Sequence, residues 1–244
     1  MFSMERNYDL SFFIRGLKSL GLVLSDKQLE QFVSYYELLT EWNSFMNLTA
    51  ITEFEEVVQK HFLDSLSLVK ACKLEKQNLI DVGTGAGFPG IPLKLVFPAL
   101  HVTLLDSLNK RVCFLNEVID KLQLKEIKAV HGRAEDFAKQ SGYREQYDLC
   151  VSRAVSNLAV LSEYCIPFVK PYGFFISYKS EKLTGELKEA QKAIKILGGE
   201  VREQVELTLP DSDIYRNLLL IKKVKQTPGK YPRKAGLPLK EPIK

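Results

Sequence analysis

Long apolar runs are absent from this sequence of 244 residues. A helix needs about 20 consecutive apolar residues to cross a bilayer, and the most apolar early stretch, SFFIRGLKSLGLVL, is interrupted by Arg15 and Lys18. No cleavage-site pattern of a secretory signal follows it. We therefore expect no membrane-spanning segment and no membrane partner, and we expect the protein to stay in the cytoplasm.

Cysteine and histidine are scarce, with four and three residues respectively. The cysteines Cys72, Cys113, Cys150 and Cys165 are far apart, and none forms a CxxC pair or has a histidine at ligand spacing. A chain with 45% apolar residues can fold without disulfides. We expect four reduced, mostly buried thiols and no metal site.

The net charge is also small, at +4, but it is unevenly spread. Residues 222–244, KKVKQTPGKYPRKAGLPLKEPIK, carry eight Lys or Arg and one Glu, a net of +7, which leaves −3 for the rest of the chain. A basic, proline-rich terminus on a slightly acidic body favours a polyanionic partner such as a nucleic acid. On charge alone, a solvated tail that keeps the protein soluble is an equal alternative.

Residues 1–72 have the pattern of an N-terminal helical extension. Ser25 is a predicted N-cap, and Gln28 three residues later is the second member of a capping box. Apolar residues then recur at helical spacing. A second helical stretch is expected from about Glu53 to Ala71.

Short apolar runs begin to alternate with helical patterns at about residue 78. The runs are NLIDV, HVTLLD, IKAVHG, YDLCVS, GFFISY, GEVREQVEL and NLLLIKKV. This alternation predicts an α/β fold with βαβ units and a mainly parallel sheet. No helix-length segment separates the last two runs, so we expect them to form an antiparallel hairpin. Residues 73–225 are the predicted core domain, and residues 226–244 the basic tail.

Glycine is concentrated in GTGAGFPGIP, residues 83–92, directly after the first run. Gly83, Gly85 and Gly87 suit the first βα turn of a nucleotide-binding fold, because glycine permits positive φ and lets backbone N–H groups approach a ligand. Asp106 ends the next run, 19 residues after Gly87, where a carboxylate can accept both hydroxyls of a ribose. Together these features favour an adenosine-bearing cofactor over a structural glycine turn with a capping aspartate.

Two cofactors fit this loop. Residues 85–90, GAGFPG, match the dinucleotide fingerprint G-x-G-x-x-G, which favours NAD. However, Gly83 already follows the strand directly, and the register DVGTGAG, with Asp81 before the loop, is usual in methyltransferases that use S-adenosylmethionine. We expect S-adenosylmethionine, with Asp81 contacting its ammonium group. An NAD-dependent oxidoreductase stays the alternative, although few residues remain for its substrate domain.

Six further motifs make a resemblance specific. NLTAI…HFLDSL, LIDVGTGAGFPGIPLKLVFP, LLDSLNKRVCFL, GRAEDF, VSRAV and YPRKAGLPLKEPI occur in that order. From about residue 36 to the end, the chain resembles the small-subunit ribosomal RNA methyltransferase G family, also called glucose-inhibited division protein B. Residues 1–35 fit the family only loosely. The resemblance implies a Rossmann-like class I methyltransferase fold with a seven-stranded sheet.

The resemblance also implies the reaction and the cofactor site. The reaction is methylation of N7 of one guanine in 16S rRNA, in the conserved loop near the decoding centre, with S-adenosylmethionine as the methyl donor. The substrate partner is then 16S rRNA or the small ribosomal subunit, and a different RNA is an alternative. The cofactor contacts carry over onto Gly83, Phe88, Ala134, Glu135 and Arg153.

Several of these residues have simpler interpretations. Phe88 could pack the loop onto the sheet, and Asp81 could brace the loop backbone. Glu135 alone could be a solvated carboxylate at a helix start. Arg153 is the expected catalytic group, either binding the cofactor or offering charge to the guanine O6 edge, and a salt bridge at a strand end is an equal alternative.

The N7 edge of guanine lies in the deep, narrow groove of A-form RNA, so the target must be in a loop or be extruded. Asn47, His61, Asp64 and Ser65 could line the mouth of the pocket, with His61 and Asp64 three apart on one helix face. For His61, the sequence alone favours a core or surface role over catalysis. The expected phosphate contacts are Lys110, Arg111, Lys179, Lys230, Arg233 and Lys234, and Tyr231 could stack on a base.

The proposed chemistry asks little of the protein. Guanine N7 has a free lone pair at neutral pH and the sulfonium methyl is already activated, so catalysis rests on positioning, which can supply roughly 7–11 kcal/mol. The sequence accordingly shows no nucleophile–base pair. A non-catalytic RNA-binding protein on the same scaffold is a further alternative, which weak S-adenosylmethionine binding would favour. We expect a monomer.

Overall fold

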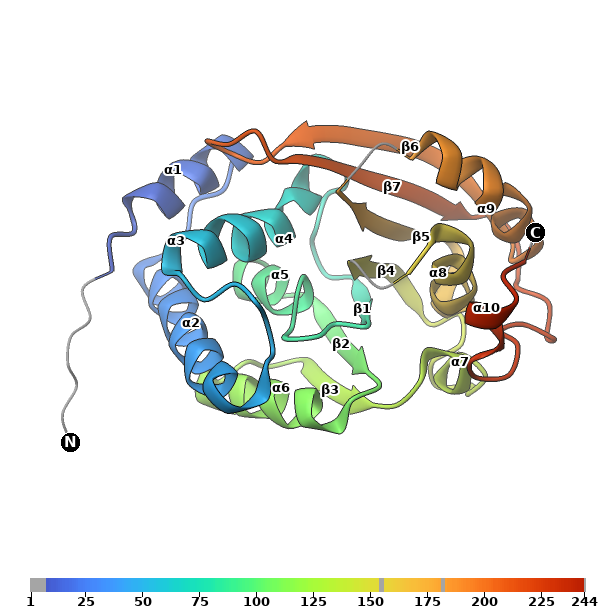
Figure 1. The fold of residues 1–244 in the computed structure, drawn as a ribbon, viewed down its shortest axis with the longest axis horizontal. Coiled ribbons are helices and arrows are strands. Elements are labelled where there is room, and N and C mark those ends of the chain that lie inside the picture. Colours follow the sequence, from blue (N-terminus) through green and yellow to red (C-terminus); the bar gives the residue numbers. More distant parts are fainter. Residues whose placement is uncertain (1–7, 154–155, 181–182, 244) are drawn as a thin grey trace.

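The computed structural model describes residues 8–153, 156–180 and 183–243, and within them seven strands form one sheet in the order β3-β2-β1-β4-β5-β7-β6 (Figure 1). The strands are β1 (Asn78–Val82), β2 (His101–Asp106), β3 (Ile127–His131), β4 (Tyr147–Arg153), β5 (Val169–Lys179), β6 (Gly199–Thr208) and β7 (Tyr215–Lys223). The first five are parallel, and β7 pairs antiparallel with both β5 and β6. The predicted parallel sheet with a final antiparallel hairpin is confirmed.

Helices cover both faces of the sheet (Figure 1). Successive residues of a strand point to opposite faces of the sheet, so Leu79 of β1 packs in one apolar cluster and Ile80 in the other. One face carries α5 (Gly90–Val96) and α6 (Asn109–Lys121). The other carries α7 (Ala134–Phe137), α8 (Leu158–Cys165), the 3₁₀ turn η3 (Ile166–Phe168) and α9 (Thr184–Ile196).

The N-terminal helices form an additional layer over α5 and α6. They are α1 (Ser11–Leu20), α2 (Asp26–Met46), α3 (Phe54–Val57), the π-helix η1 (Val58–Leu63), α4 (Asp64–Leu66) and the 3₁₀ turn η2 (Ser67–Lys70). The predicted capping box is present, since Ser25 and Gln28 each bond the other's backbone N–H. The Gln28 amide also donates to Leu95 O at 2.8 Å, which fixes α2 against α5.

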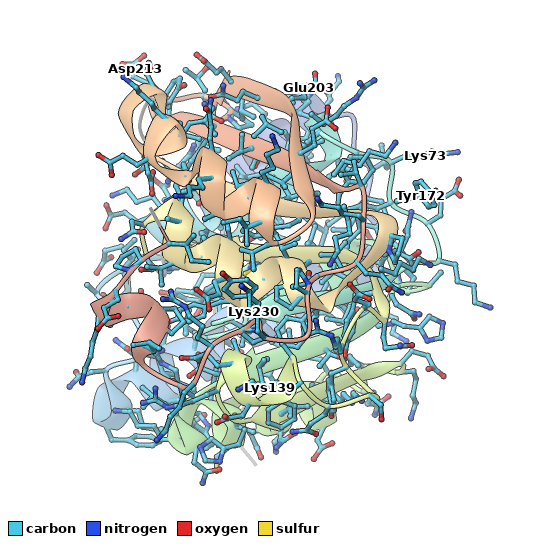
Figure 2. All side chains as sticks on the ribbon, turned by 90° about the vertical axis from the view of Figure 1, so that its right-hand side faces the viewer. Lys73, Lys139, Tyr172, Glu203, Asp213 and Lys230 are labelled. Atoms are coloured by element: carbon cyan, nitrogen blue, oxygen red, sulfur yellow. The ribbon has the colours of Figure 1, made fainter. Side chains whose placement is uncertain are left out.

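The C-terminal tail packs against the α7–α8 side of the molecule, where it ends in α10 (Leu237–Lys240). The Arg144 guanidinium donates to the carbonyls of Thr227 and Tyr231 at 2.7 and 2.8 Å. Lys230 is exposed on the tail, and Figure 2 shows it on the same side of the molecule as Lys139. The tail is therefore anchored to the body, in part through its backbone, while some of its cations face solvent.

Candidate cofactor and acceptor site

The glycine-rich loop joins β1 to α5 at the carboxyl edge of the sheet. Gly83, Gly85 and Gly87 have φ of 71°, 63° and 98°, a region that favours glycine. A Cβ on Gly87 would come within 2.5 Å of Ile91 Cδ1, whereas a Cβ on Gly85 would meet no atom within 4 Å. The space above Gly85 is open because Gly85 lines a cavity. The loop thus offers its bare backbone to a ligand.

Asp81 lies beneath this loop and is fully buried. Its Oδ2 accepts from the Thr84 hydroxyl at 2.7 Å and from the Gly90 N–H at 2.8 Å. Burial raises the pKa of this carboxyl from 3.8 to about 7. The geometry therefore gives Asp81 a bracing role, and its contact with a ligand ammonium group stays a prediction.

Asp106, at the end of β2, borders a cavity of about 370 Å³ together with the glycine loop. Its Oδ2 accepts from the Gly85 N–H and its Oδ1 from the Leu108 N–H, both at 2.9 Å. Arg111 approaches the same carboxylate at 3.4 Å. Asp106 is thus a buried acceptor fixed beside the loop, where the sequence predicts a ribose.

A smaller cavity of about 160 Å³ continues along the strand ends and shares Gly83 with the first. Ala134 and Glu135, at the start of α7, line it. The buried Glu135 carboxylate accepts from the N–H of Gly236, which belongs to the tail, at 2.8 Å. The two cavities share Gly83 and Ser107, and we call the pair the trough.

Arg153, at the end of β4, is held by the N-terminal extension. Its Nη1 donates to Asp64 Oδ2 at 2.8 Å and to the Lys60 carbonyl at 3.1 Å. Asp64 Oδ1 also accepts from Arg216 Nε at 2.7 Å, so one buried carboxylate holds two arginines. The predicted salt bridge of Arg153 is present, and its partner comes from a helix distant in sequence.

His61 lies between Arg153 and Thr49. The Arg153 Nη2 is 3.1 Å from His61 Nδ1, and Thr49 Oγ1 is 2.9 Å from Nε2. Because a guanidinium only donates, Nδ1 accepts and Nε2 carries the proton. Burial and the Arg153 charge lower the pKa of His61 from 6.5 to about 3. His61 is therefore neutral, and the lone pair of its Nδ1 is occupied.

Phe88 joins these groups to the glycine loop. Its ring stacks on His61 with centroids 4.4 Å apart, and the Arg153 guanidinium lies 5.2 Å from the ring centroid. The Tyr35 hydroxyl of α2 donates to the Ala86 carbonyl of the same loop. Phe88 thus packs the loop, as the simpler interpretation has it. It also lines the cavity of about 370 Å³ beside the loop, which we call the cofactor cavity.

A second cavity, of about 580 Å³, lies on the other side of Arg153 and His61, which line both cavities. Its other lining residues are mostly polar and come from the extension, from the segment after β4, and from β5 and β7. Residues that line it include Ile51, Lys60, Asp64, Ser156, Tyr178, Lys179 and Arg216. Arg153 and His61 therefore stand between a cofactor-sized trough and a second cavity large enough for a purine.

The residues predicted to contact RNA are placed unevenly. Lys179 lines the second cavity, where it pairs with Glu186 at 2.7 Å. Asn47 is the left-handed C-cap of α2 and is exposed, with φ of 50°. Arg111 lies at the cofactor cavity. Lys110, exposed beside it, donates to the Met46 carbonyl at 3.2 Å.

The tail residues differ among themselves. The Arg233 guanidinium forms a paired contact with the buried Glu163 carboxylate, with Nη2 to Oε2 at 2.7 Å and Nε to Oε1 at 2.9 Å. Lys230 and Lys234 are exposed, and Tyr231 packs partly against the apolar cluster around α8. RNA contacts from these residues stay predictions, and for Arg233 the geometry favours a structural role.

Sequence reasoning did not single out Arg216 or Tyr35. Arg216 reaches the site because β7 pairs with β5, which ends at the same edge. Tyr35 reaches it because α2 crosses the glycine loop. An arginine just before the apolar run LLLI, in YRNLLLIKK, was the visible signal for Arg216.

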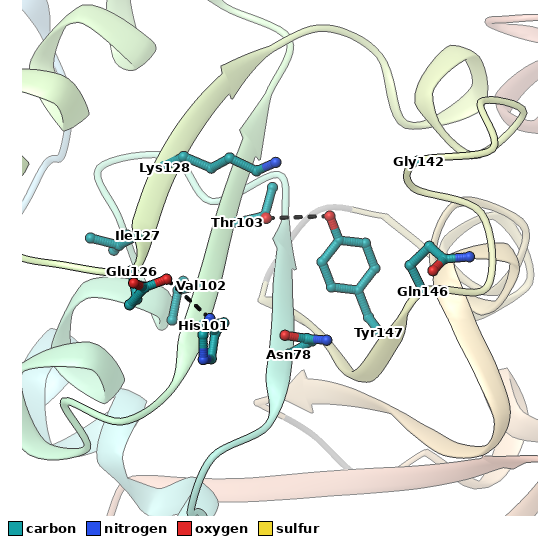
Figure 3. A pocket seen from close by; sticks show the side chains of 10 residues that line it. All are labelled: Asn78, His101, Val102, Thr103, Glu126, Ile127, Lys128, Gly142, Gln146 and Tyr147. Carbon is teal, nitrogen blue, oxygen red and sulfur yellow. Dashed lines mark hydrogen bonds and ion pairs between the residues drawn. The ribbon is translucent and has the colours of Figure 1, made fainter.

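Another hollow, of about 460 Å³, lies at the opposite, amino-terminal edge of the sheet (Figure 3). Its polar groups mostly satisfy one another: His101 pairs with Glu126 at 3.2 Å, and the Tyr147 hydroxyl donates to Thr103 at 3.2 Å. Ligands of open α/β sheets bind at the carboxyl ends of the strands. This hollow is therefore not the candidate site.

Other expectations concern metals, thiols and membranes. In the part of the chain that the structure describes, no three His, Cys, Asp or Glu side chains gather into a possible metal site. Cys150 and Cys165 are buried, but Cys113 is exposed and Cys72 is half-buried. The expectation that most thiols are buried is therefore correct for only two of the four. Among the same residues, no helix is long and apolar enough to cross a membrane.

Solved structures with the same fold have low sequence identity to this chain. A SAM-dependent methyltransferase from Aquifex aeolicus superposes with a TM-score of 0.52 at 19% identity, over 70% of this chain and 94% of that one. TYW2 from M. jannaschii, in complex with AdoMet, gives 0.53 at 13% identity, over 72% of this chain and 79% of that one. These likenesses support the class I methyltransferase fold.

Sequence comparisons identify the family. The model of rRNA small subunit methyltransferase G, GidB, matches residues 28–215. Ribosomal RNA small subunit methyltransferase G from Lachnoclostridium phytofermentans is 60% identical over 96% of this chain and 98% of its own length. The Alkaliphilus metalliredigens protein of the same name is 57% identical over 94% and 96%. The chain therefore belongs to the rRNA small subunit methyltransferase G family, whose cofactor is S-adenosylmethionine.

Proposed function

We propose that this protein transfers a methyl group from S-adenosylmethionine to N7 of one guanine in 16S rRNA, in the conserved loop near the decoding centre. Family membership supports the substrate and the reaction. One structural observation carries the mechanism: the cofactor trough and the second cavity meet at Arg153 and His61. Methyl transfer from the cofactor to the guanine would therefore take place beside these two side chains, where the two cavities meet.

The cofactor side is built for recognition. The backbone of Gly83 and Gly85 lies open toward the trough, and the Asp106 and Glu135 carboxylates are acceptors for hydroxyl and amine donors. When bound, S-adenosylmethionine supplies a methyl group already activated on a sulfonium. Asp81 and Tyr35 hold the loop in shape from below.

The acceptor side is cationic and positions the base. Arg153 and Arg216, fixed by Asp64, face the second cavity together with Lys179. A guanidinium there can donate to O6 of guanine and leave N7 free for the methyl group. His61 is not a general base, because its Nδ1 lone pair is occupied. The reaction needs none, since N7 has a free lone pair.

The target guanine has to be unpaired or extruded, because the N7 edge of an RNA duplex is inaccessible and the base has to enter the second cavity. We further infer that the protein acts as a monomer in the cytoplasm, where its substrate is assembled. Whether it prefers naked RNA, an assembling particle or the complete subunit decides when it acts.

Methyl transfer from labelled S-adenosylmethionine to unmodified small subunits and to their naked RNA, with mapping of the labelled nucleotide, tests the function. Label at N7 of a single guanine in 16S rRNA is the expected result. Label at another atom or in another RNA would show that the proposed substrate is wrong, while the fold and the cofactor would still be right. Absence of methyl transfer together with preferential binding of NADH would favour the alternative that the protein is an NAD-dependent oxidoreductase.

A further inference from the structure

Two aromatic side chains lie on the last turns of α2, three residues apart on one face of the helix. The rings of Trp42 and Phe45 have centroids 5.5 Å apart, and Phe45 is 66% exposed. The Trp42 ring also contacts the ring of Phe114 of α6, with the two centroids 5.6 Å apart. The Lys110 ammonium reaches Met46 O at 3.2 Å, so this cation lies against the end of α2. We call Trp42, Phe45 and Lys110 the rim patch.

The rim patch is close in sequence to residues that line the cofactor cavity. Leu48 and Thr49, which directly follow α2, line this cavity. Ser107 and Arg111, on either side of Lys110 in sequence, line it as well. The patch therefore lies close to the lining of the cofactor cavity, on the side where α2 ends.

The exposure of Phe45 has no packing explanation within the described residues. A buried phenylalanine contributes about 2–3 kcal/mol through its apolar surface, and Phe45 forgoes most of this. Its ring nevertheless packs against Trp42, and the Lys110 ammonium contacts the carbonyl of Met46, the next residue in the chain. Single-stranded nucleic acids are bound by this combination, in which an aromatic ring stacks on a base and a cation contacts the phosphate.

We propose that the rim patch is a stacking platform for an unpaired base of the substrate RNA, one that neighbours the methylated guanine. The base lies on Phe45, and Lys110 contacts the adjoining phosphate. The inference rests on the proposed function, because it names the part of the protein that holds the RNA while the target enters the second cavity. An RNA fits the patch better than an apolar partner, because the Lys110 cation lies at the same end of α2 as the exposed ring.

Trp42 gives a direct signal, because it is the only tryptophan in the chain. A base stacked on the platform is expected to quench its fluorescence when a stem–loop RNA carrying the target guanine is titrated. The same RNA with the flanking unpaired bases replaced by abasic sites is expected to quench far less. No quenching with either RNA would contradict the proposal.

Kinetics give the second test. Phe45→Ala is expected to raise KM for the RNA about five-fold or more, as loss of one stacked base predicts, with kcat and S-adenosylmethionine affinity within two-fold of wild type. Phe45→Tyr keeps a ring and is expected to retain wild-type KM. Tyr172, another exposed aromatic at 76%, lies near the start of β5 (Figure 2), so Tyr172→Ala is the matched control and is expected to change nothing.

The outcomes separate the two proposals. Normal methylation with an unchanged RNA KM for Phe45→Ala would overturn the platform and leave the proposed function intact. An effect seen with complete subunits but absent with naked RNA would show a ribosomal protein on the patch instead. Loss of a dimer in Phe45→Ala would show a second copy there. Absence of methylation by the wild type would refute the proposed function itself.

Discussion

Arg153 and His61 are bonded to each other, with Nη2 of the arginine 3.1 Å from Nδ1 of the histidine. The first residue ends β4 in the sheet, and the second lies in the π-helix of the N-terminal extension. Their contact closes the cofactor cavity on one side and the second cavity on the other. π-helical turns often occur at functional sites. The extension is therefore part of the site and not only a cover for the sheet.

Replacement of Asp64, which accepts from both Arg153 and Arg216, is expected to lower the stability and the activity of the protein. Asp64→Asn leaves Arg153 and Arg216 buried without their counter-charge, and loss of one partner of a buried ion pair costs about 3–5 kcal/mol. Urea unfolding should show a loss of this order together with slower methyl transfer. Glu117 forms an exposed pair with Lys121, so Glu117→Gln is the control and should change stability little. Equal effects of the two variants would contradict the role of Asp64.

Tyr35 is expected to set the shape of the glycine loop. Tyr35→Phe removes the donor to the Ala86 carbonyl, and a hydrogen bond of this kind contributes about 0.5–1.5 kcal/mol. S-adenosylmethionine affinity, measured by calorimetry, should fall several-fold. Tyr36→Phe removes a neighbouring hydroxyl that donates to Thr52 instead, so its cofactor affinity should match the wild type. A normal affinity in Tyr35→Phe would show that the loop holds its shape unaided.

His61 predicts a pH dependence of stability. Its pKa is about 3 in the folded protein and about 6.5 in the unfolded chain, because Arg153 and burial disfavour the cation. The unfolded state therefore binds the extra proton between these values, and the contribution of neutral His61 is present above pH 6.5 and lost as pH falls toward 3. The slope is at most about 1.4 kcal/mol per pH unit.

Urea unfolding of the wild type and of His61→Asn over pH 4–7 measures this effect. The stability advantage of the wild type should shrink as pH falls. Asp81 acts in the opposite direction, because its raised pKa of about 7 lets the folded state bind a proton first, but this effect is common to both proteins. A constant difference between the two would show that His61 titrates normally.

Replacement of Arg233 tests whether this residue holds the tail against the body or contacts RNA. Arg233→Ala breaks the contact with the buried Glu163, so backbone amides of residues 228–243 should exchange hydrogen faster. Lys230→Ala changes an exposed residue of the same tail and should leave exchange unchanged. If Arg233→Ala lowers RNA affinity without altering exchange, Arg233 is a phosphate contact, as the sequence first suggested.

Local signals carried much of the fold. The capping box at Ser25 and the glycine loop depend on a few neighbouring residues, so the sequence predicted both correctly. The Arg153–Asp64–Arg216 cluster combines three distant segments, and only the packing of the extension on the sheet brings them together. The tail illustrates the same limit, because composition shows its charge but not the buried Glu163 that fixes Arg233.

The central claim is that cofactor and guanine occupy separate cavities that meet at Arg153 and His61. Its most direct test compares S-adenosylmethionine affinity with methyl transfer in two variants of normal melting temperature. Ile51→Trp fills the second cavity, and Asp106→Asn alters the trough. We expect Ile51→Trp to abolish transfer with cofactor affinity within two-fold of wild type, and Asp106→Asn to weaken cofactor binding. Loss of cofactor affinity in Ile51→Trp, or undiminished transfer by it, would contradict the two-cavity account.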